Sequence, residues 1–124
     1  MIMLRKILRQ NLPEIFEKFI EFNLPFEYYF AEKLLSMFAG YFNTEMTFRI
    51  WDLIFLEGSS TDQTRSTWVL IISLYVLIRR NSERILKCNS PNDIILVLNT
   101  YAQFNMDYDG FIEEINVLLE KLFQ

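Results

Sequence analysis

Histidine is absent from this chain of 124 residues, and cysteine occurs once, at Cys88. Without histidine, the chain cannot form the Ser-His and Cys-His pairs that activate many nucleophilic enzymes, and it lacks the commonest metal ligand. A single cysteine excludes an internal disulfide bond, and the sequence contains no Asn-x-Ser/Thr glycosylation motif. Because both features are typical of intracellular proteins, we expect an intracellular, cytoplasmic protein. We also expect no cofactor.

Glycine and proline are also scarce, with three residues of each. An all-β fold needs many turns, so this scarcity argues against it. Basic residues are outnumbered, because 12 Lys and Arg stand against 16 Asp and Glu, for a formal charge of −4. A nucleic-acid-binding protein needs a basic surface to meet phosphates, so we expect no nucleic acid among the partners.

Long hydrophobic runs are missing as well. The best candidate, residues 68–78, is apolar except for Ser73 and is about half of the ~20 residues that a membrane helix requires. We interpret it as a buried helix and expect no transmembrane segment. The first thirteen residues carry Arg5, Lys6 and Arg9 without an acidic residue, as targeting presequences do. Because they are poor in serine and run into the next helical pattern, we interpret them as the end of a truncated helix instead.

Hydrophobic residues make up 52% of the chain, including twelve Phe, six Tyr and two Trp, which is enough to build a core. Apolar residues recur at helical spacing in every readable segment, and no segment alternates usefully with a period of two. We therefore predict an all-α fold, a compact multi-helix bundle that forms a single lobe over residues 1–124. The expected helices cover residues 12–22, 26–41, 44–58, 66–78, 82–86, 91–101 and 109–122, with a loop at residues 59–63.

Capping residues set the expected starts of four helices. Asn11, Thr44 and Asp109 each carry a side-chain oxygen that can accept a hydrogen bond from a first helical turn. Ser90 gives the strongest start signal, because a proline follows it and Asp93 stands three residues later.

The segment 44–58 is apolar on nearly every side, so we expect it to be the central helix, with Trp51, Ile54 and Phe55 in the core. The segment 66–78 is also apolar on more than one side, and the mean hydropathy of the chain is +0.14. A bundle of this size has little depth in which to surround two such helices. We therefore expect a partner to cover an apolar face.

Residues 48–58 read Phe-Arg-Ile-Trp-Asp-Leu-Ile-Phe-Leu-Glu-Gly. They resemble the R-I/V-W-D-x-x-F-x-E-G signature near the C-terminal half of the TBC domain, the domain of Rab GTPase-activating proteins. Residues 12–14, 29–38 and 86–98 resemble further segments of that domain, so the resemblance extends from about residue 11 to 124. Lys33 stands where the family has Trp, Asn43 stands where it often has Pro, and residues 59–65 form a longer loop. The signature residues here are Arg49, Trp51, Asp52, Phe55, Glu57 and Gly58.

The resemblance implies where the chemistry of such a domain lies. In that family an Arg and a Gln act as two fingers, in the motifs I-x-x-D-x-x-R and Y-x-Q upstream of the signature. The Arg stabilises charge on the transferring phosphoryl group, and the Gln orients the attacking water. Here only 48 residues precede Arg49. The D-x-x-R at residues 62–65 and the Y-x-Q formed by Tyr101 and Gln103 both lie downstream, so we expect no catalytic residue in this chain.

Two hypotheses of function follow from the resemblance. In the first, the chain is the non-enzymatic C-terminal lobe of a Rab GTPase-activating domain in vesicle trafficking. It supports the finger-bearing lobe, and a Rab-type small GTPase binds to the complete domain. The upstream lobe or other protein subunits are then its partners. In the second, the chain is a catalytically inactive TBC-like helical module that serves as a scaffold subunit of a larger assembly.

Three charged groups have both a structural and a functional interpretation. Arg49 and Asp52 are neighbours on a helix, which favours a partly buried ion pair over contact with a GTPase. The group Arg79, Arg80, Arg84 and Lys87 is basic, and it either complements a helix C-terminus or meets an acidic GTPase surface or a lipid headgroup. The last group resembles an EF-hand loop, but its twelfth position lacks the glutamate that closes a calcium site, so we expect no metal. Its residues are Asn105, Asp107, Asp109, Gly110, Ile112 and, at the twelfth position, Asn116.

Overall fold

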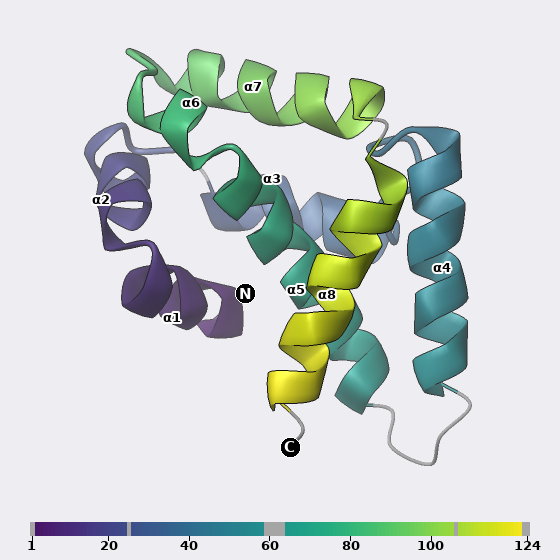
Figure 1. The fold of residues 1–124 in the computed structure, drawn as a ribbon. Coiled ribbons are helices and arrows are strands. Elements are labelled where there is room, and N and C mark those ends of the chain that lie inside the picture. The colour runs from purple at the N-terminus through teal and green to yellow at the C-terminus, as the bar shows by residue number, and fades with distance from the viewer. Residues whose placement is uncertain (1, 25, 59–63, 106, 123–124) are drawn as a thin grey trace.

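The computed structural model describes residues 2–24, 26–58, 64–105 and 107–122. Within these ranges the chain forms eight helices and no strand, which confirms the predicted all-α fold (Figure 1). In chain order they are α1 (Ile2–Asn11), α2 (Pro13–Glu21), α3 (Phe26–Leu35), α4 (Thr44–Gly58), α5 (Thr64–Arg80), α6 (Ser82–Leu86), α7 (Pro91–Phe104) and α8 (Tyr108–Leu122). None of the described helices is both long and apolar enough to cross a membrane.

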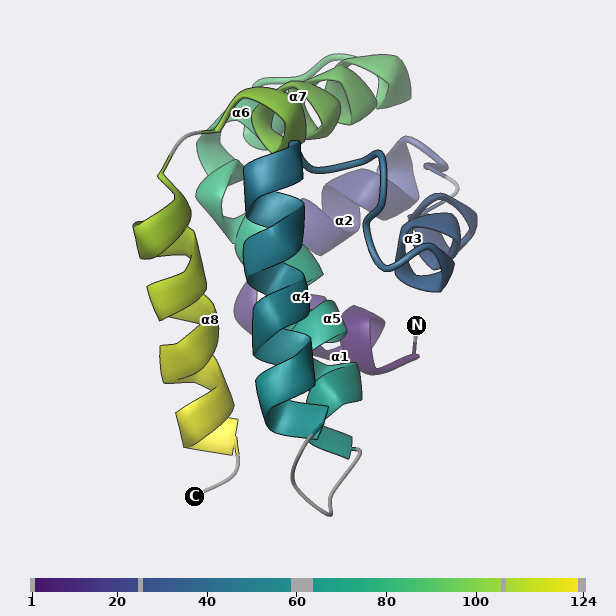
Figure 2. The same cartoon turned by 90° about the vertical axis from the view of Figure 1, so that its right-hand side faces the viewer.

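Helix α5 is the centre of the molecule. It packs against α1, α3, α4, α6, α7 and α8, and α7 crosses above its C-terminal end (Figures 1 and 2). Every residue from 71 to 78 is buried, including the hydroxyl of Ser73, which donates to the carbonyl of Val69 at 2.6 Å. A helix that is apolar on all sides must be surrounded to be stable, and the run at residues 68–78 meets that condition.

Helix α4 is therefore not the central helix that its composition predicted. It packs against α5 and α8, its Trp51 contacts the turn after α3, and its remaining side faces outward (Figure 2). Ile54 lies in the core as predicted, and Trp51 is half-buried, with its indole N–H donating to the carbonyl of Met37 at 2.7 Å. Phe55 is 65% exposed, so its predicted place in the core was wrong. The reason is geometric, because α4 presents one face to α5 and α8 and Phe55 lies on another.

The observed start of α4 lies at a different cap from the predicted one. The side-chain oxygen of Asn43 accepts from the backbone N–H of Met46 at 2.9 Å, so Asn43 caps the helix and Thr44 does not. The start of α7 is as predicted, because the hydroxyl of Ser90 accepts from the N–H of Asp93 at 3.2 Å. In both helices the capping side chain belongs to the residue just before the helix and bonds the N–H of its third residue. Thr44 is itself the first residue of α4, so it lies one position too late to act as this cap.

Residues 2–11 form a packed helix, α1. In α1, Leu4 and Leu8 are buried, and the helix lies against α2 and α5. Asn11 does not cap α2 as predicted, because it is the last residue of α1 and its amide donates back to the carbonyl of Ile7 at 2.9 Å. Helix α2 then starts at Pro13, where a missing N–H costs nothing.

Helix α3 ends at Leu35, earlier than the predicted end at residue 41. Three residues after it have positive φ angles: 52° at Met37, 66° at Phe38 and 76° at Gly40. Left-handed backbone at non-glycine residues is unfavourable and ends a right-handed helix. The resulting turn buries the rings of Phe38 and Tyr41 in the core from outside a helix.

Candidate functional site

The N-terminus of the signature helix α4 is attached to the end of α7 through Asn43. Its backbone N–H donates to the carbonyl of Ala102 at 2.9 Å, and its side-chain amide donates to the carbonyl of Asn105 at 2.9 Å. Asn43 replaces a proline that is frequent in the resembling family. Proline has neither an N–H nor a capping side chain, so all these bonds depend on the departure from the family pattern.

Arg49, the first residue of the signature, is turned toward α8. It pairs with Glu45 at 3.1 Å one helical turn before it and with Asp109 of α8, and its guanidinium lies 5.3 Å from the ring of Tyr108. Hydrogen bonds with Glu45 and then with Asp109 raise the pKa of Arg49. The predicted pair with Asp52 was wrong, because Asp52 lies on the outward face of α4, whereas Arg49 leans toward the neighbouring helix.

The two acidic residues of the EF-hand-like loop between α7 and α8 form ion pairs with different arginines. Asp107 pairs with Arg80 at 3.0 Å, while Asp109 pairs with Arg49. Asp107 also accepts from the N–H of Gly110 at 3.2 Å, so Asp107 caps α8 and the predicted cap, Asp109, lies inside the first turn. The residues that the structure describes include no group of three or more acidic, Cys or His side chains that could hold a metal ion.

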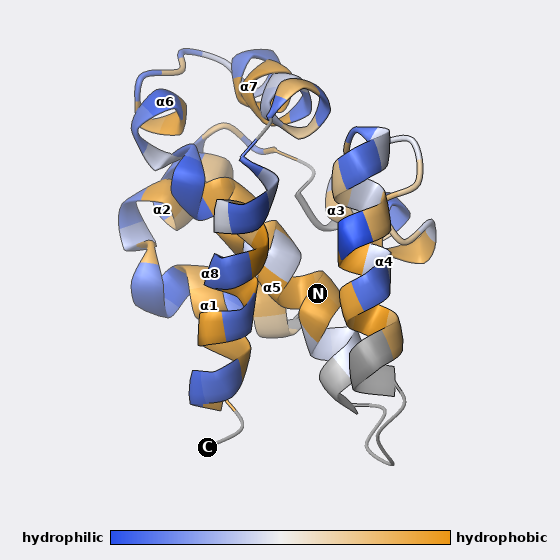
Figure 3. Cartoon of the chain, turned by 45° about the vertical axis from the view of Figure 1, so that its right-hand side comes forward, coloured by the Kyte–Doolittle hydropathy of each residue, from blue (hydrophilic) through white to orange (hydrophobic). Residues whose placement is uncertain are grey.

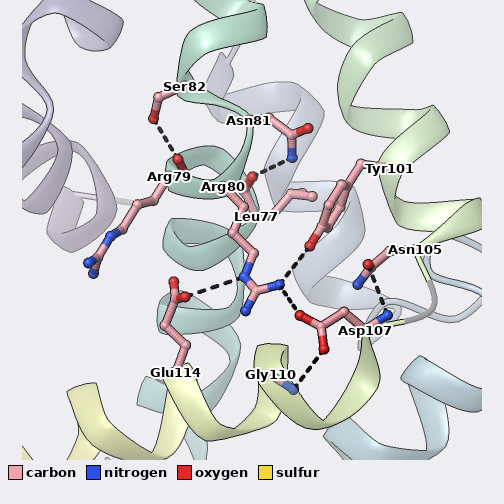
Figure 4. Close-up of polar contacts among 10 residues, drawn as sticks. All are labelled: Leu77, Arg79, Arg80, Asn81, Ser82, Tyr101, Asn105, Asp107, Gly110 and Glu114. Atoms are coloured by element: carbon pink, nitrogen blue, oxygen red, sulfur yellow. Dashed lines mark hydrogen bonds and ion pairs between the residues drawn. The ribbon is translucent and has the colours of Figure 1, made fainter.

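Arg80 joins three helices at the end of α5 (Figure 4). Its guanidinium donates to Glu114 at 3.3 Å, to Asp107 at 3.0 Å and to the hydroxyl of Tyr101 at 3.2 Å. It also lies 5.6 Å from the ring centre of Phe111. Burial opposes the charge of Arg80, but its hydrogen bonds with Tyr101 and Asp107 and its ionic contacts outweigh that effect and raise its pKa.

The basic group of the sequence had two interpretations, complementing a helix C-terminus or meeting an acidic GTPase surface or a lipid headgroup, and neither gave Arg80 its partners. Arg79 and Arg80 do lie in the last turn of α5, but the guanidinium of Arg80 bonds side chains of α7, of α8 and of the residue before α8. Arg80 is half-buried, whereas Arg79, Arg84 and Lys87 are exposed. The three polar partners of Arg80 lie 21, 27 and 34 residues further along the chain, so no local spacing could have indicated them.

The Y-x-Q sequence is part of α7, and both of its side chains bond within the fold. The amide of Gln103 donates to the carbonyl of Gly40 at 3.3 Å and to the carbonyl of Tyr41. It thereby joins α7 to the turn that follows α3, while Tyr101 accepts from Arg80. The side chains of the D-x-x-R sequence at residues 62–65, and those of signature positions 57 and 58, are not among the side chains that the structure describes.

Lys33, which replaces a family Trp, lies among tyrosines. Its ammonium is 5.1 Å from the ring centres of both Tyr29 and Tyr41. The Tyr29 hydroxyl hydrogen-bonds to the side chain of Asn99 and lies 3.3 Å from that of Tyr41. Burial is the main cause that raises the pKa of both tyrosines. A cation–π contact thus occupies the position where the resemblance implies a ring.

Two grooves run beside the outward face of α4, one on each side of Phe48. The groove toward the α3–α4 turn has a volume of about 370 Å³ and is lined by residues that include Asn43, Trp51 and Gln103. The groove toward α8 has a volume of about 490 Å³ and is lined by residues that include Arg49 and Asp52. Phe48 belongs to both linings and is 54% exposed, so it forms the ridge between them.

Comparison with known proteins gives a family for this arrangement. The chain matches the model of the Rab-GTPase-TBC domain family over residues 1–86, which include α1 to α6. It is similar to the TBC domain-containing protein C4G8.04 of Schizosaccharomyces pombe (strain 972 / ATCC 24843), at 25% identity over 114 residues. That alignment covers 91% of this chain and 14% of the relative, so the chain spans about one seventh of the relative's length. No solved structure matches the chain.

Proposed function

The chain belongs to the Rab-GTPase-TBC domain family, and from this membership we propose that it is the C-terminal lobe of a Rab GTPase-activating domain. In this role it supports an upstream lobe that carries the catalytic arginine and glutamine. The complete domain then binds a Rab-type GTPase. It acts in the cytoplasm, in vesicle trafficking. The signature at residues 48–58 supports this placement, because the resembling family has its finger motifs upstream of that signature.

The observation that carries the proposal is that the side chain of Gln103 is hydrogen-bonded within the fold. A glutamine finger acts by orienting an attacking water, for which its amide must be free to bond that water. The amide of Gln103 instead donates to two backbone carbonyls of the α3–α4 turn. In addition, Gln103 lies on α7, which begins after the last residue of the family match. We infer that the glutamine and arginine of the active domain come from another segment.

Single-turnover GTP hydrolysis on a panel of Rab proteins tests the proposal. The chain alone should leave the intrinsic rate unchanged. Together with an upstream TBC lobe that carries both motifs, it should accelerate hydrolysis toward the ~10³–10⁵-fold effect of an arginine finger. The controls are the upstream lobe alone and the upstream lobe with its finger arginine changed to alanine. Acceleration by the chain alone that disappears in Gln103→Ala would show that the Y-x-Q sequence is catalytic.

The alternative proposal is a catalytically inactive scaffold subunit. The observation in its favour is the outward face of α4, where Phe48 and Phe55 are 54% and 65% exposed and offer a contact surface that needs no GTP chemistry. This alternative predicts that no upstream lobe restores hydrolysis. The chain should then be recovered from cells in a stable assembly whose integrity does not depend on the nucleotide state of any GTPase.

A further inference from the structure

The outward face of α4 carries acidic and aromatic residues in alternation. Glu45, Phe48, Asp52 and Phe55 occur at i, i+3, i+7 and i+10, so they form one stripe along about three helical turns. All four are exposed, and bands of hydrophilic and hydrophobic colour alternate along the helix (Figure 3). We call these four residues the α4 stripe.

The α4 stripe has the shape of a helix-binding surface. The opposite side of α4 packs against α5 and α8, so the stripe is held on a rigid support. Grooves of about 370 Å³ and 490 Å³ lie on either side of Phe48. An amphipathic helix binds such a surface by placing apolar side chains one turn apart into grooves beside a ridge.

The charge of the α4 stripe selects the kind of helix. Asp52 forms no ion pair with any residue in the described ranges, and Glu45 shares Arg49 with Asp109. Three carboxylates thus lie near one guanidinium on this side of the molecule. Anionic lipid surfaces and acidic helices are repelled by such a surface, whereas lysine and arginine side chains are attracted to it.

We propose that the α4 stripe binds a basic amphipathic helix of a partner protein. The apolar residues of that helix pack beside Phe48 and Phe55, and its Lys or Arg residues pair with Asp52 and Glu45. This inference goes beyond the proposed function, because it concerns a face of the chain that requires neither a GTPase nor a catalytic lobe.

A second copy of this chain is a poorer fit to the α4 stripe. Its basic helix is α1, with Arg5, Lys6 and Arg9 and no acidic residue. The apolar side chains of that helix that would be needed for binding, Leu4 and Leu8, are already buried in its own core. Self-association through α4 is therefore an outcome that the test must separate from binding of a partner helix.

Fluorescence anisotropy with a labelled amphipathic peptide of leucine and lysine, about 14 residues or roughly four helical turns long, tests the proposal. A peptide of the same pattern with glutamate in place of lysine is the matched probe. We expect the lysine peptide to bind and the glutamate peptide not to bind. The affinity should fall about tenfold or more in Phe48→Ala/Phe55→Ala and in Asp52→Lys. It should also weaken as salt is raised.

Two control variants match these changes elsewhere on the surface. Leu96→Ala removes a side chain of α7 that is 65% exposed, and Glu17→Lys reverses an exposed charge on α2. Both should retain the affinity of the unmodified chain, and circular dichroism should show that every variant keeps its helices. Equal binding of both peptides, or equal losses in stripe and control variants, would overturn the proposal. So would light scattering that shows a dimer of the chain that Phe55→Ala converts to a monomer.

Discussion

Asp107 has two contacts at the start of α8 that depend on its charge. Hydrogen bonds from Arg80 and then from the N–H of Gly110 lower its pKa. Because the pKa in the folded chain lies below the unfolded value of about 3.9, the unfolded chain binds the proton first as the pH falls. The stabilisation from Asp107 is therefore complete above that pH and is lost as the pH drops through the lowered pKa.

We predict that the urea midpoint of the chain falls between about pH 5 and pH 3, and that it falls less in Asp107→Asn. Asparagine keeps a capping oxygen for α8 but cannot titrate, so the difference between the two curves isolates the charge. Midpoints that fall in parallel for both proteins would show that the contact between Asp107 and Arg80 contributes nothing to stability.

Trp51 and Phe55 are neighbours in the signature with opposite environments. Trp51 is half-buried and donates to the carbonyl of Met37, whereas Phe55 is 65% exposed. We predict that Trp51→Ala lowers the free energy of unfolding by about 3 kcal/mol, since it leaves a cavity and an unpaired carbonyl. Phe55→Ala should change it by less than about 0.5 kcal/mol, as is usual for surface sites. Similar losses for the two variants in urea denaturation would contradict the observed burial.

At the scale of the element, the sequence predicts helices better than their ends. The run at residues 68–78 is buried or half-buried as its composition indicated, and Ser90 with Asp93 marks the start of α7 correctly. The end of α3 was missed because its left-handed residues include Met37 and Phe38, which carry no local signal for that conformation. Tertiary packing of these side chains determines the left-handed conformation and therefore the end of α3.

The choice between α4 and α5 as the central helix could not be made from composition. Both segments are apolar on more than one side, and only the positions of the other helices determine which one is surrounded. The residues of the candidate site could not be identified from the sequence for a similar reason. The four aromatic or acidic residues of the α4 stripe recur at helical spacing in the sequence, but a core face and an exposed face give the same spacing. The pair of Arg49 with Glu45 is local, but the pairs of Arg49 and Arg80 with residues 107, 109 and 114 depend on α8 and the residue before it, which lie far along the chain.

The cap of α4 provides a test at this scale. Asn43 bonds the first turn of α4 and the end of α7, whereas the neighbouring Thr44 is exposed. We predict that Asn43→Ala lowers the free energy of unfolding by about 1–2 kcal/mol, through loss of the cap and of one interhelix hydrogen bond. Thr44→Ala should cost less than about 0.5 kcal/mol. The opposite order in urea denaturation would restore Thr44 as the cap.

At the scale of the whole molecule, the chain combines a closed core with an open surface. The α5 helix is surrounded by six others, yet large apolar side chains remain exposed on α3, α4 and α7. Outside the α4 stripe, Leu35 is 88% exposed and Phe104 is 77% exposed. Apolar patches of more than a few hundred Å² are uncommon on monomeric proteins and usually mark contact surfaces.

We predict that the isolated chain depends on a partner for full stability. A dye that reports exposed apolar surface should bind the chain, and adding an upstream TBC lobe should displace it and raise the melting temperature. If that lobe is present at about 100 times its dissociation constant, mass action adds about 2.7 kcal/mol to the free energy of unfolding. The control is an unrelated helical protein at the same concentration, which should leave both signals unchanged. A well-folded monomer in light scattering that binds no dye, and whose melting temperature no upstream lobe alters, would contradict this dependence. That result would favour the free-standing scaffold, because a module that needs no second lobe has no apolar face that such a lobe must cover.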